Sequence, residues 1–397
     1  MTTSESIRQT WRSIATTFLR LGITSYGGPA IMGIMQTELQ EKRQWVSRDQ
    51  FLEGLSVVNM LPGATATQLG IFLGYVRGGW WGGLLAGVCF VLPGFFVILG
   101  LTVAYAGLGL NPAVHGALYG LGPVVLAIFA VAVYRLSRTA ARTVPQAVIC
   151  VLAAVTAIGT PLGIAAILVL AGAAGLLIFH SRNARAVAIV SAVSCLAVLP
   201  TVWSATWAPT LAPARALPHP GVVDLAAYFF KVGAFTVGGG LTMIAFIQDQ
   251  VVGQLGWLTP REFIDGLALG QLTPGPILML AAYVGYKVAG ITGAVVAAGA
   301  AFLPSFVLML AILPVLERAR TLAWTRAVMR GTAPAVVGVL AVSLFRLAPY
   351  ALPDLFAGAI LALSLVAVVV YRLATVRVMI AGSLLGALRT HFRMVGT

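Results

Sequence analysis

Long apolar runs recur along this 397-residue chain and leave few folds open to it. Two of them cover residues 82–106 and 113–134, and each is long enough to cross a hydrocarbon core as a helix. Hydrophobic residues make up 59% of the sequence and charged residues 9%, whereas a soluble domain carries about 25% charged residues. So few charges cannot cover a surface that faces water. The sequence therefore predicts an all-α polytopic membrane protein with about 13 hydrophobic segments.

Proline and glycine interrupt these apolar runs at two similar places. NMLPGATATQLG begins at Asn59, and QLTPGPILML begins at Gln271. Proline breaks a helix and glycine weakens it, so each stretch predicts a helix break inside an apolar segment. Glycines at 27–28 and 238–240 indicate two more breaks. In lipid, a broken helix is tolerated only where protein or a watery cavity covers its unpaired N–H and C=O groups.

The two halves of the sequence also match one another. FLRLGITSYGGP, from Phe18, resembles FKVGAFTVGGG, from Phe230, and the Trp and Pro residues that follow match in nearly constant register. Matches of this kind over a long stretch indicate a duplication. The predicted organisation is a first repeat at 10–145, connecting transmembrane segments at 146–220, a second repeat at 221–350, and a C-terminal transmembrane segment with a basic tail at 351–397.

Basic residues predict that one repeat is upside down relative to the other. The connection at 108–112 has no Arg or Lys, while its counterpart in the second half is rich in Arg; the next connection reverses this pattern. Cytoplasmic loops carry the excess of Arg and Lys, so equivalent loops lie on opposite sides of the membrane. Inverted repeats of this kind are common in secondary transporters. In the second half, the counterpart of 108–112 carries Arg318, Arg320, Arg326 and Arg330. In the next connection, the first half carries Arg135, Arg138 and Arg142, and the second half carries only Arg346.

The first two apolar stretches leave two topologies open. Basic residues flank them on every side, so they are either re-entrant hairpins or kinked helices that cross the membrane. As hairpins they would turn at 26–29 and at 61–63. Legs of about ten residues, at 1.5 Å per residue, would reach roughly the bilayer midplane.

The chemistry of a helix break predicts what it binds. The helix that begins after Pro62-Gly63 offers unpaired N–H groups near residues 64–66, and these groups and the helix dipole favour an anion. Gly63 has no Cβ, so an anion can approach the backbone closely. Residues 274–276 predict the same chemistry in the second half, with Gln271 and Thr273 nearby. The alternative is that Pro and Gly only kink and pack the helices, as they often do in membranes.

Charged residues near these breaks also favour an anionic ligand. Arg20 and Lys231 occupy equivalent positions, and intramembrane cations are costly and usually functional; snorkelling from a helix end is their alternative role. Glu53 and Asp265 are equivalent acids whose roles are gating or proton coupling, or an ion pair with a nearby Arg. The predicted oxyanion site consists of Arg20, Ser25, Tyr26, Gly27, Gly28, Asn59, Pro62, Gly63, Ala64, Thr65, Gln68, Lys231, Gly238, Gly239, Gly240, Gln271, Thr273, Pro274 and Gly275.

Other classes of function find little support in the sequence. The net charge of +14 fits basic cytoplasmic loops, and the sequence shows no surface domain for nucleic acid. The three Cys stand apart from one another, and the four His are scattered, which predicts no metal site and no cofactor. A membrane-embedded reductase is the alternative from another class, but redox cofactors leave motifs that are missing here. The N-terminus shows no cleavable signal peptide.

The spaced motifs resemble those of the chromate ion transporter family, in its two-domain form. The resemblance runs from FLRLGITSYGGP through NMLPGATATQLG to FVLPGF in the first half. It continues through KVGAFTVGGG, GWLTPREFIDGLALGQLTPGPI and FLPSF in the second. It implies an exporter in a bacterial-type inner membrane that handles chromate as a sulfate-like oxyanion and confers chromate resistance. The family often has Pro after the first Leu-Pro-Gly, where this chain has Ala64; this predicts one more free N–H at the first helix start.

Energetics permit export without a coupling ion. A dianion that leaves a cell 100 mV negative inside gains about 4.6 kcal/mol. That free energy supports roughly a thousandfold gradient. Proton coupling through Glu53 and Asp265 stays open, as do sulfate or another tetrahedral oxyanion as the cargo, and a homodimer as the assembly.

Overall fold

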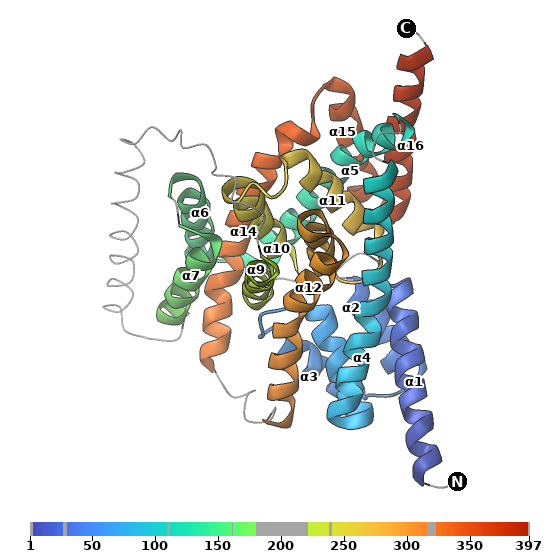
Figure 1. Ribbon diagram of the computed structural model, residues 1–397. Coiled ribbons are helices and arrows are strands. Elements are labelled where there is room, and N and C mark those ends of the chain that lie inside the picture. The colour runs from blue at the N-terminus through green and yellow to red at the C-terminus, as the bar shows by residue number, and fades with distance from the viewer. Residues whose placement is uncertain are drawn as a thin grey trace. The chain divides into compact units, whose positions relative to one another are not determined.

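A computed structural model describes residues 3–26, 30–108, 112–160, 162–179, 221–237, 240–315 and 323–395 (Figure 1). These residues are largely helical, with no strand among them. Within the described ranges, four helices are long and apolar enough to cross a membrane. The prediction of an all-α polytopic membrane protein is therefore confirmed. The four helices cover Thr65–Leu108, Val114–Ala140, Ile277–Ile312 and Arg326–Ala351.

The chain packs as two compact units, and each draws on both predicted repeats. Unit 1 contains residues 1–109, 219–243 and 266–321, and unit 2 contains residues 110–218, 244–265 and 322–397. The predicted domain boundaries and the inverted orientation stay predictions. The predicted connection at 146–220 lies largely outside the described residues, and so do Arg318 and Arg320.

Unit 1 is built around two long helices, α4 (Thr65–Leu108) and α12 (Leu280–Ile312), which pack against each other. Helix α1 (Thr3–Thr24) packs on α4, and α9 (Val222–Phe235) packs on α12 (Figure 1). Shorter elements connect them: α2 (Ala30–Met35), the π-helix η1 (Gln36–Lys42), α3 (Arg48–Val58), α10 (Leu241–Phe246), α11 (Pro260–Leu272), and the 3₁₀ turns η3 (Ile277–Met279) and η4 (Leu313–Val315). The α10 and α11 helices each run from one unit into the other.

Glycines at equivalent positions allow these helix pairs to approach closely. A Cβ atom at Gly22 on α1 would lie 2.6 Å from the carbonyl oxygen of Phe90 on α4. A Cβ atom at Gly233 on α9 would lie 2.1 Å from the carbonyl oxygen of Ala301 on α12. No larger residue fits at either position without moving a helix backbone, so both contacts depend on the glycine.

The long helices α4 and α12 also share an internal break that the sequence analysis did not predict. Gly78 and Gly79 have φ angles of −141° and 64°, and Ala289 and Gly290 have φ angles of −142° and 62°. The same backbone conformation therefore recurs at positions that the predicted duplication makes equivalent. The segments beyond these breaks run antiparallel: Gly83 lies against Leu310, and Gly87 lies against Phe306.

The two π-helices repeat as well. η1 in the first half matches η2 (Ile247–Gln254) in the second. Each is closed by a tryptophan amide: the Trp45 N–H donates to the Leu39 carbonyl at 2.8 Å, and the Trp257 N–H donates to the Val251 carbonyl at 2.9 Å. The hydrophobic pattern of residues 36–42 and 247–254 does not indicate π-helical geometry.

Unit 2 is a helical bundle in which α14 (Ala323–Ala351) packs against α5 (Pro112–Ala140), α6 (Val144–Gly159) and α7 (Ile164–Phe179). Helix α5 also packs against α15 (Leu355–Val369) and α16 (Thr375–Val395). Asp354 joins these last three helices: it caps α15 by accepting from the Ala357 N–H at 3.0 Å, and it accepts from Tyr119 and Arg389. The hydrogen bonds from Arg389 and Tyr119 hold the pKa of Asp354 well below its ordinary value.

Candidate functional site

Each Pro-Gly break in unit 1 is closed by a hydrogen bond to the opposite repeat. Gly63 lies between α3 and α4 with a φ of 128°, and its N–H donates to the Thr236 carbonyl at 2.6 Å. Gly275 lies between α11 and η3 with a φ of 99°, and its N–H donates to the Ser25 carbonyl at 2.8 Å. Ser25 and Thr236 are themselves equivalent positions at the ends of α1 and α9.

These two bonds explain how the breaks are tolerated in apolar surroundings. Ser25 and Thr236 are fully buried, and both Pro-Gly glycines are buried as well. A buried C=O or N–H without a partner costs free energy comparable to a lost hydrogen bond. Each bond satisfies the glycine amide at one Pro-Gly break and a buried carbonyl at the end of α1 or α9. Protein therefore pairs backbone groups that would otherwise need water.

The amide of Ala64 is not free, which corrects one expectation. Its N–H donates to the Oγ of Ser305 on α12 at 2.8 Å, and Ser305 is fully buried. The two residues lie 241 positions apart in the sequence. Because position 64 is Ala rather than Pro, it has an N–H, but that N–H already donates to Ser305 of the opposite repeat.

Unpaired donors do remain in the first turn of α4. The first amides of a helix have no intrahelical acceptor, and those of residues 65–67 donate to no residue that the structure describes. The Oγ1 of Thr67 is buried without a hydrogen-bond partner among the described residues, as is the Oε1 of Gln68. The Nε2 of Gln68 donates to the Pro62 carbonyl at 2.8 Å, which holds the amide group in place. The positive end of the helix dipole adds to this group of donors.

The second helix start has the same backbone break but different chemistry. Its first residues are Ile277, Leu278 and Met279, which carry no side-chain donor. The residue before them is Pro276, which has no N–H. The position equivalent to Ser305 is Gly94, where a Cβ atom would lie 2.5 Å from the Pro274 carbonyl oxygen.

Other predicted site residues lie apart from these buried starts. Arg20 and Lys231 are exposed on α1 and α9, and neither bonds to the helix starts within the described part of the chain. Arg20 lines a cavity of about 610 Å³ in unit 1. Thr17, Thr24, Glu38 and Lys42 also line that cavity.

The remaining predicted residues have mixed placements. Tyr26 and Asn59 are exposed, and Gln271 is half-buried. The Thr273 hydroxyl donates to the Leu269 carbonyl at 2.8 Å, and Gly240 is buried with a φ of 93°. Gly27, Gly28, Gly238 and Gly239 lie outside the described residues.

The two acids expected to gate or couple transport differ in their surroundings. Glu53 is half-buried on α3. Asp265 is buried on α11, and its Oδ1 lies 3.4 Å from the Nε of Arg261, one helical turn earlier. Asp265 therefore has a nearby Arg with which it can form an ion pair, which is the alternative to a role in gating or proton coupling.

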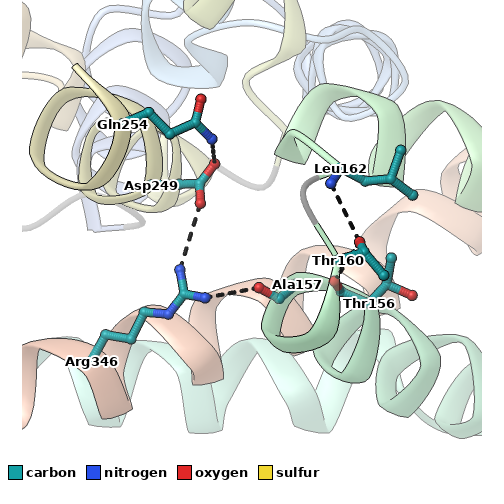
Figure 2. Close-up of polar contacts among 7 residues, drawn as sticks. All are labelled: Thr156, Ala157, Thr160, Leu162, Asp249, Gln254 and Arg346. Atoms are coloured by element: carbon teal, nitrogen blue, oxygen red, sulfur yellow. Dashed lines mark hydrogen bonds and ion pairs between the residues drawn. The ribbon is translucent and has the colours of Figure 1, made fainter. Parts of the chain in front are cut away.

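Sequence reasoning missed another acid, Asp249 of η2, which pairs with Arg346 of α14 in unit 2 (Figure 2). The Oδ1 of Asp249 lies 3.5 Å from the Nη1 of Arg346, and Gln254 donates to Oδ2 at 3.2 Å. The Nη2 of Arg346 donates to the Ala157 carbonyl of α6 at 2.9 Å. Burial raises the pKa of Asp249 above its ordinary value, although Arg346 acts in the opposite direction. The signal in the sequence was Arg346 itself, a lone cation in an apolar segment.

Comparisons with known proteins agree with these observations. The family model described as "Chromate transporter" matches residues 12–179 and 223–387, once in each half. A chromate transport protein of Cupriavidus metallidurans is 32% identical over 87% of this chain and 84% of its own length. A probable chromate transport protein of Synechococcus elongatus is 31% identical over 85% of this chain and 84% of its own. A chromate transport protein of Pseudomonas aeruginosa is 32% identical over 83% and 79%. No solved structure matches the chain.

Proposed function

The chain belongs to the chromate transporter family, and from that premise we propose that it exports chromate across the cytoplasmic membrane and so confers chromate resistance. Chromate is a tetrahedral dianion with the charge and shape of sulfate, so sulfate is the second candidate cargo. The protein is a multi-pass membrane protein, and its work is transport rather than catalysis.

One observation carries the proposal: the buried first turn of α4 in unit 1. Three backbone amides there have no acceptor among the described residues, and the buried Thr67 hydroxyl is unpartnered. Such a group of donors at the positive end of a helix stabilises an anion. Burial strengthens this attraction because water is excluded. A sulfate-like oxyanion presents four oxygens that can each accept a hydrogen bond, which matches a site made of donors.

The arrangement within unit 1 supports transport through inverted repeats. Equivalent segments of α4 and α12 run antiparallel, as a twofold axis perpendicular to these helices would make them. The exchanged bonds from Gly63 to Thr236 and from Gly275 to Ser25 follow the same relation. In transporters of this type, binding lies between the repeats and access alternates as one repeat moves against the other.

Voltage alone supplies enough driving force for this export. A dianion gains about 4.6 kcal/mol on leaving a cell at 100 mV negative inside. We therefore propose a uniport, with proton coupling through Glu53 and Asp265 as the alternative.

The test is chromate flux into everted membrane vesicles or proteoliposomes, at an imposed voltage and with or without a pH gradient. Flux that follows voltage alone is the expected result. Flux that requires the pH gradient would replace the uniport with a coupled mechanism, and sulfate flux without chromate flux would change the cargo. Production of Cr(III) by the purified protein would indicate a reductase instead.

Variants link the flux to the site. Replacing Pro62 and Gly63 together by Ala should abolish transport in protein that still inserts and remains monodisperse. The control is Thr102→Val in the same helix, because the Thr102 hydroxyl already donates to the Ile98 carbonyl at 2.6 Å. Unchanged transport in the Pro62 and Gly63 variant would reject the site.

A further inference from the structure

We propose that the oxyanion binds at only one of the two duplicated helix starts, the one at Thr65, and that hydroxyl groups of Ser305 and Thr67 are two of its ligands. This inference rests on the proposed function, because it names the residues that hold that cargo. It departs from the expectation that both starts bind alike.

The Ser305 hydroxyl can act as a hydrogen-bond donor. Its Oγ accepts from the Ala64 amide at 2.8 Å, which uses the oxygen and leaves the hydroxyl hydrogen free. That hydrogen donates to no residue that the structure describes. Ser305 is fully buried, so it also has no bulk water as a partner. A buried donor without an acceptor is costly, and a bound anion would remove that cost.

The position of Ser305 is set closely by the break itself. A Cβ atom at Gly63 would lie 2.5 Å from the Ser305 Oγ and 2.6 Å from the Gln68 Nε2. The two polar groups therefore pack directly against the bare backbone of Gly63. This places the hydroxyl beside the start of α4, where the free amides of residues 65–67 lie.

Thr67 supplies the second hydroxyl from the same helical turn. Its Oγ1 is buried and has no partner among the described residues, and its side chain is completely buried. With three backbone amides and the two hydroxyl groups, the first start offers several donors and no carboxylate. An oxyanion that carries no proton accepts from all of them.

The second start has lost the matching groups together. Pro276 stands where Ala64 stands and has no N–H to give; Gly94 stands where Ser305 stands and has no hydroxyl to accept it. Because donor and acceptor are both missing, the second start has no unsatisfied pair at this point. Its first turn is apolar, with Met279 close to the position of Thr67. These features fit a structural partner of the site rather than a second site.

The number of bound oxyanions tests the inference directly. Equilibrium dialysis of the full-length purified protein against radioactive chromate, and separately against radioactive sulfate, should give one oxyanion per chain. Two per chain would overturn the inference. A hydrogen bond to a charged group is strong, so Ser305→Ala should weaken binding by about ten- to a hundredfold.

Matched variants separate a ligand from a structural role. Thr67→Val, which keeps the side-chain shape, should also weaken binding by about tenfold or more. Thr102→Val removes a buried hydroxyl whose hydrogen already has an acceptor, and Met279→Leu alters the second start; neither should change the affinity. If Ser305→Ala does not yield folded protein, Thr67→Val against Met279→Leu decides the question.

The outcomes distinguish this inference from the proposed function. Wild-type protein that binds and transports the oxyanion, together with unchanged affinity in Ser305→Ala and Thr67→Val, overturns this inference alone. Equal losses in Thr67→Val and Met279→Leu would also overturn it, because both starts would then contribute. Wild-type protein that neither binds nor transports chromate or sulfate overturns both.

Discussion

The two Pro-Gly breaks of unit 1 share a backbone conformation but differ in the side chains around them. Both place a glycine at positive φ, and both donate its amide to the end of a helix in the opposite repeat. Around Gly63, a serine hydroxyl and a glutamine amide pack directly against the backbone; around Gly275, no atom of the described residues, its chain neighbours apart, lies within 4 Å of where a Cβ would stand. Both breaks make the same bond between the two halves of the sequence, while only the first has the side chains that we propose for binding.

A second pair of equivalent residues shows the same divergence. Glu38 of η1 bonds within its own segment, to Arg43 at 3.0 Å and to Lys42 at 3.5 Å. Asp249 of η2 keeps the matching local bond, from Gln254 at 3.2 Å, and adds an ion pair with Arg346 of another helix. Of these matching acids, only Asp249 therefore has a long-range cation among the described residues.

The largest expected contrast is between Gly63→Ala and Gly275→Ala. An alanine at either positive φ adds strain of about 1–3 kcal/mol. At Gly63 the new methyl group also overlaps the Ser305 and Gln68 side chains, and such overpacking costs about another 1–3 kcal/mol. Thermal unfolding in detergent should show the greater loss for Gly63→Ala, with loss of transport. Equal losses would mean that the two breaks are packed alike.

Removing one arginine from each half should give the next contrast. Arg346→Ala leaves the half-buried Asp249 without its cation and frees the Ala157 carbonyl, so we expect a loss of about 1–3 kcal/mol. Arg43→Ala removes one of the two cations beside Glu38, with Lys42 still in place, so we expect less than about 1 kcal/mol. Chemical unfolding of the two variants measures the difference. A larger loss for Arg43→Ala would reverse the comparison.

Converting the first start toward the second should have a moderate effect. Gln68→Met removes the hydrogen bond to the Pro62 carbonyl and leaves that carbonyl without its donor, which costs about 1 kcal/mol. Met279→Leu keeps the volume of an apolar side chain and should cost less than that. The shift in unfolding midpoint reports both. A cost for Met279→Leu as large as that of Gln68→Met would show that this polar contact adds nothing.

The smallest contrast is in pH dependence, and its sign differs between the two acids. The bond from Arg43 lowers the pKa of Glu38 below 4.5, so its contribution to stability is present above that pH and is lost as the pH falls. Burial raises the pKa of Asp249 above 3.8, so its contribution is present below that pH and is lost as the pH rises through the raised pKa. These signs follow from proton linkage.

Melting temperatures measured across acidic and neutral pH check these signs. The difference between wild type and Glu38→Gln should shrink as the pH falls, and salt should weaken it. The wild type should lose stability relative to Asp249→Asn as the pH rises, because the amide does not titrate and resembles the protonated acid. Parallel trends in the two variants would contradict the contrast between the local and the long-range pair.

Local residue chemistry in the sequence was enough to predict the breaks. Pro and Gly at 62–63 and 274–275 placed them correctly, because these residues act on their own backbone. The contact between Ala64 and Ser305 was beyond reach, since it joins residues 241 positions apart. For the same reason the amide of Ala64 was wrongly taken as free. Gly78 and Gly79 had the residue type for a kink, but an apolar helix with glycine reads as continuous in sequence.

The exchanged bonds between the two repeats have a consequence for how the protein is made. The amide of Gly63 needs the carbonyl of Thr236, which leaves the ribosome about 170 residues later. At typical rates of synthesis, this delay lasts roughly 10 to 35 seconds. Throughout that interval the first break is in place without its partner, so lipid, water or the insertion machinery has to cover it. The first repeat therefore cannot complete its hydrogen bonds until the second repeat has been synthesised.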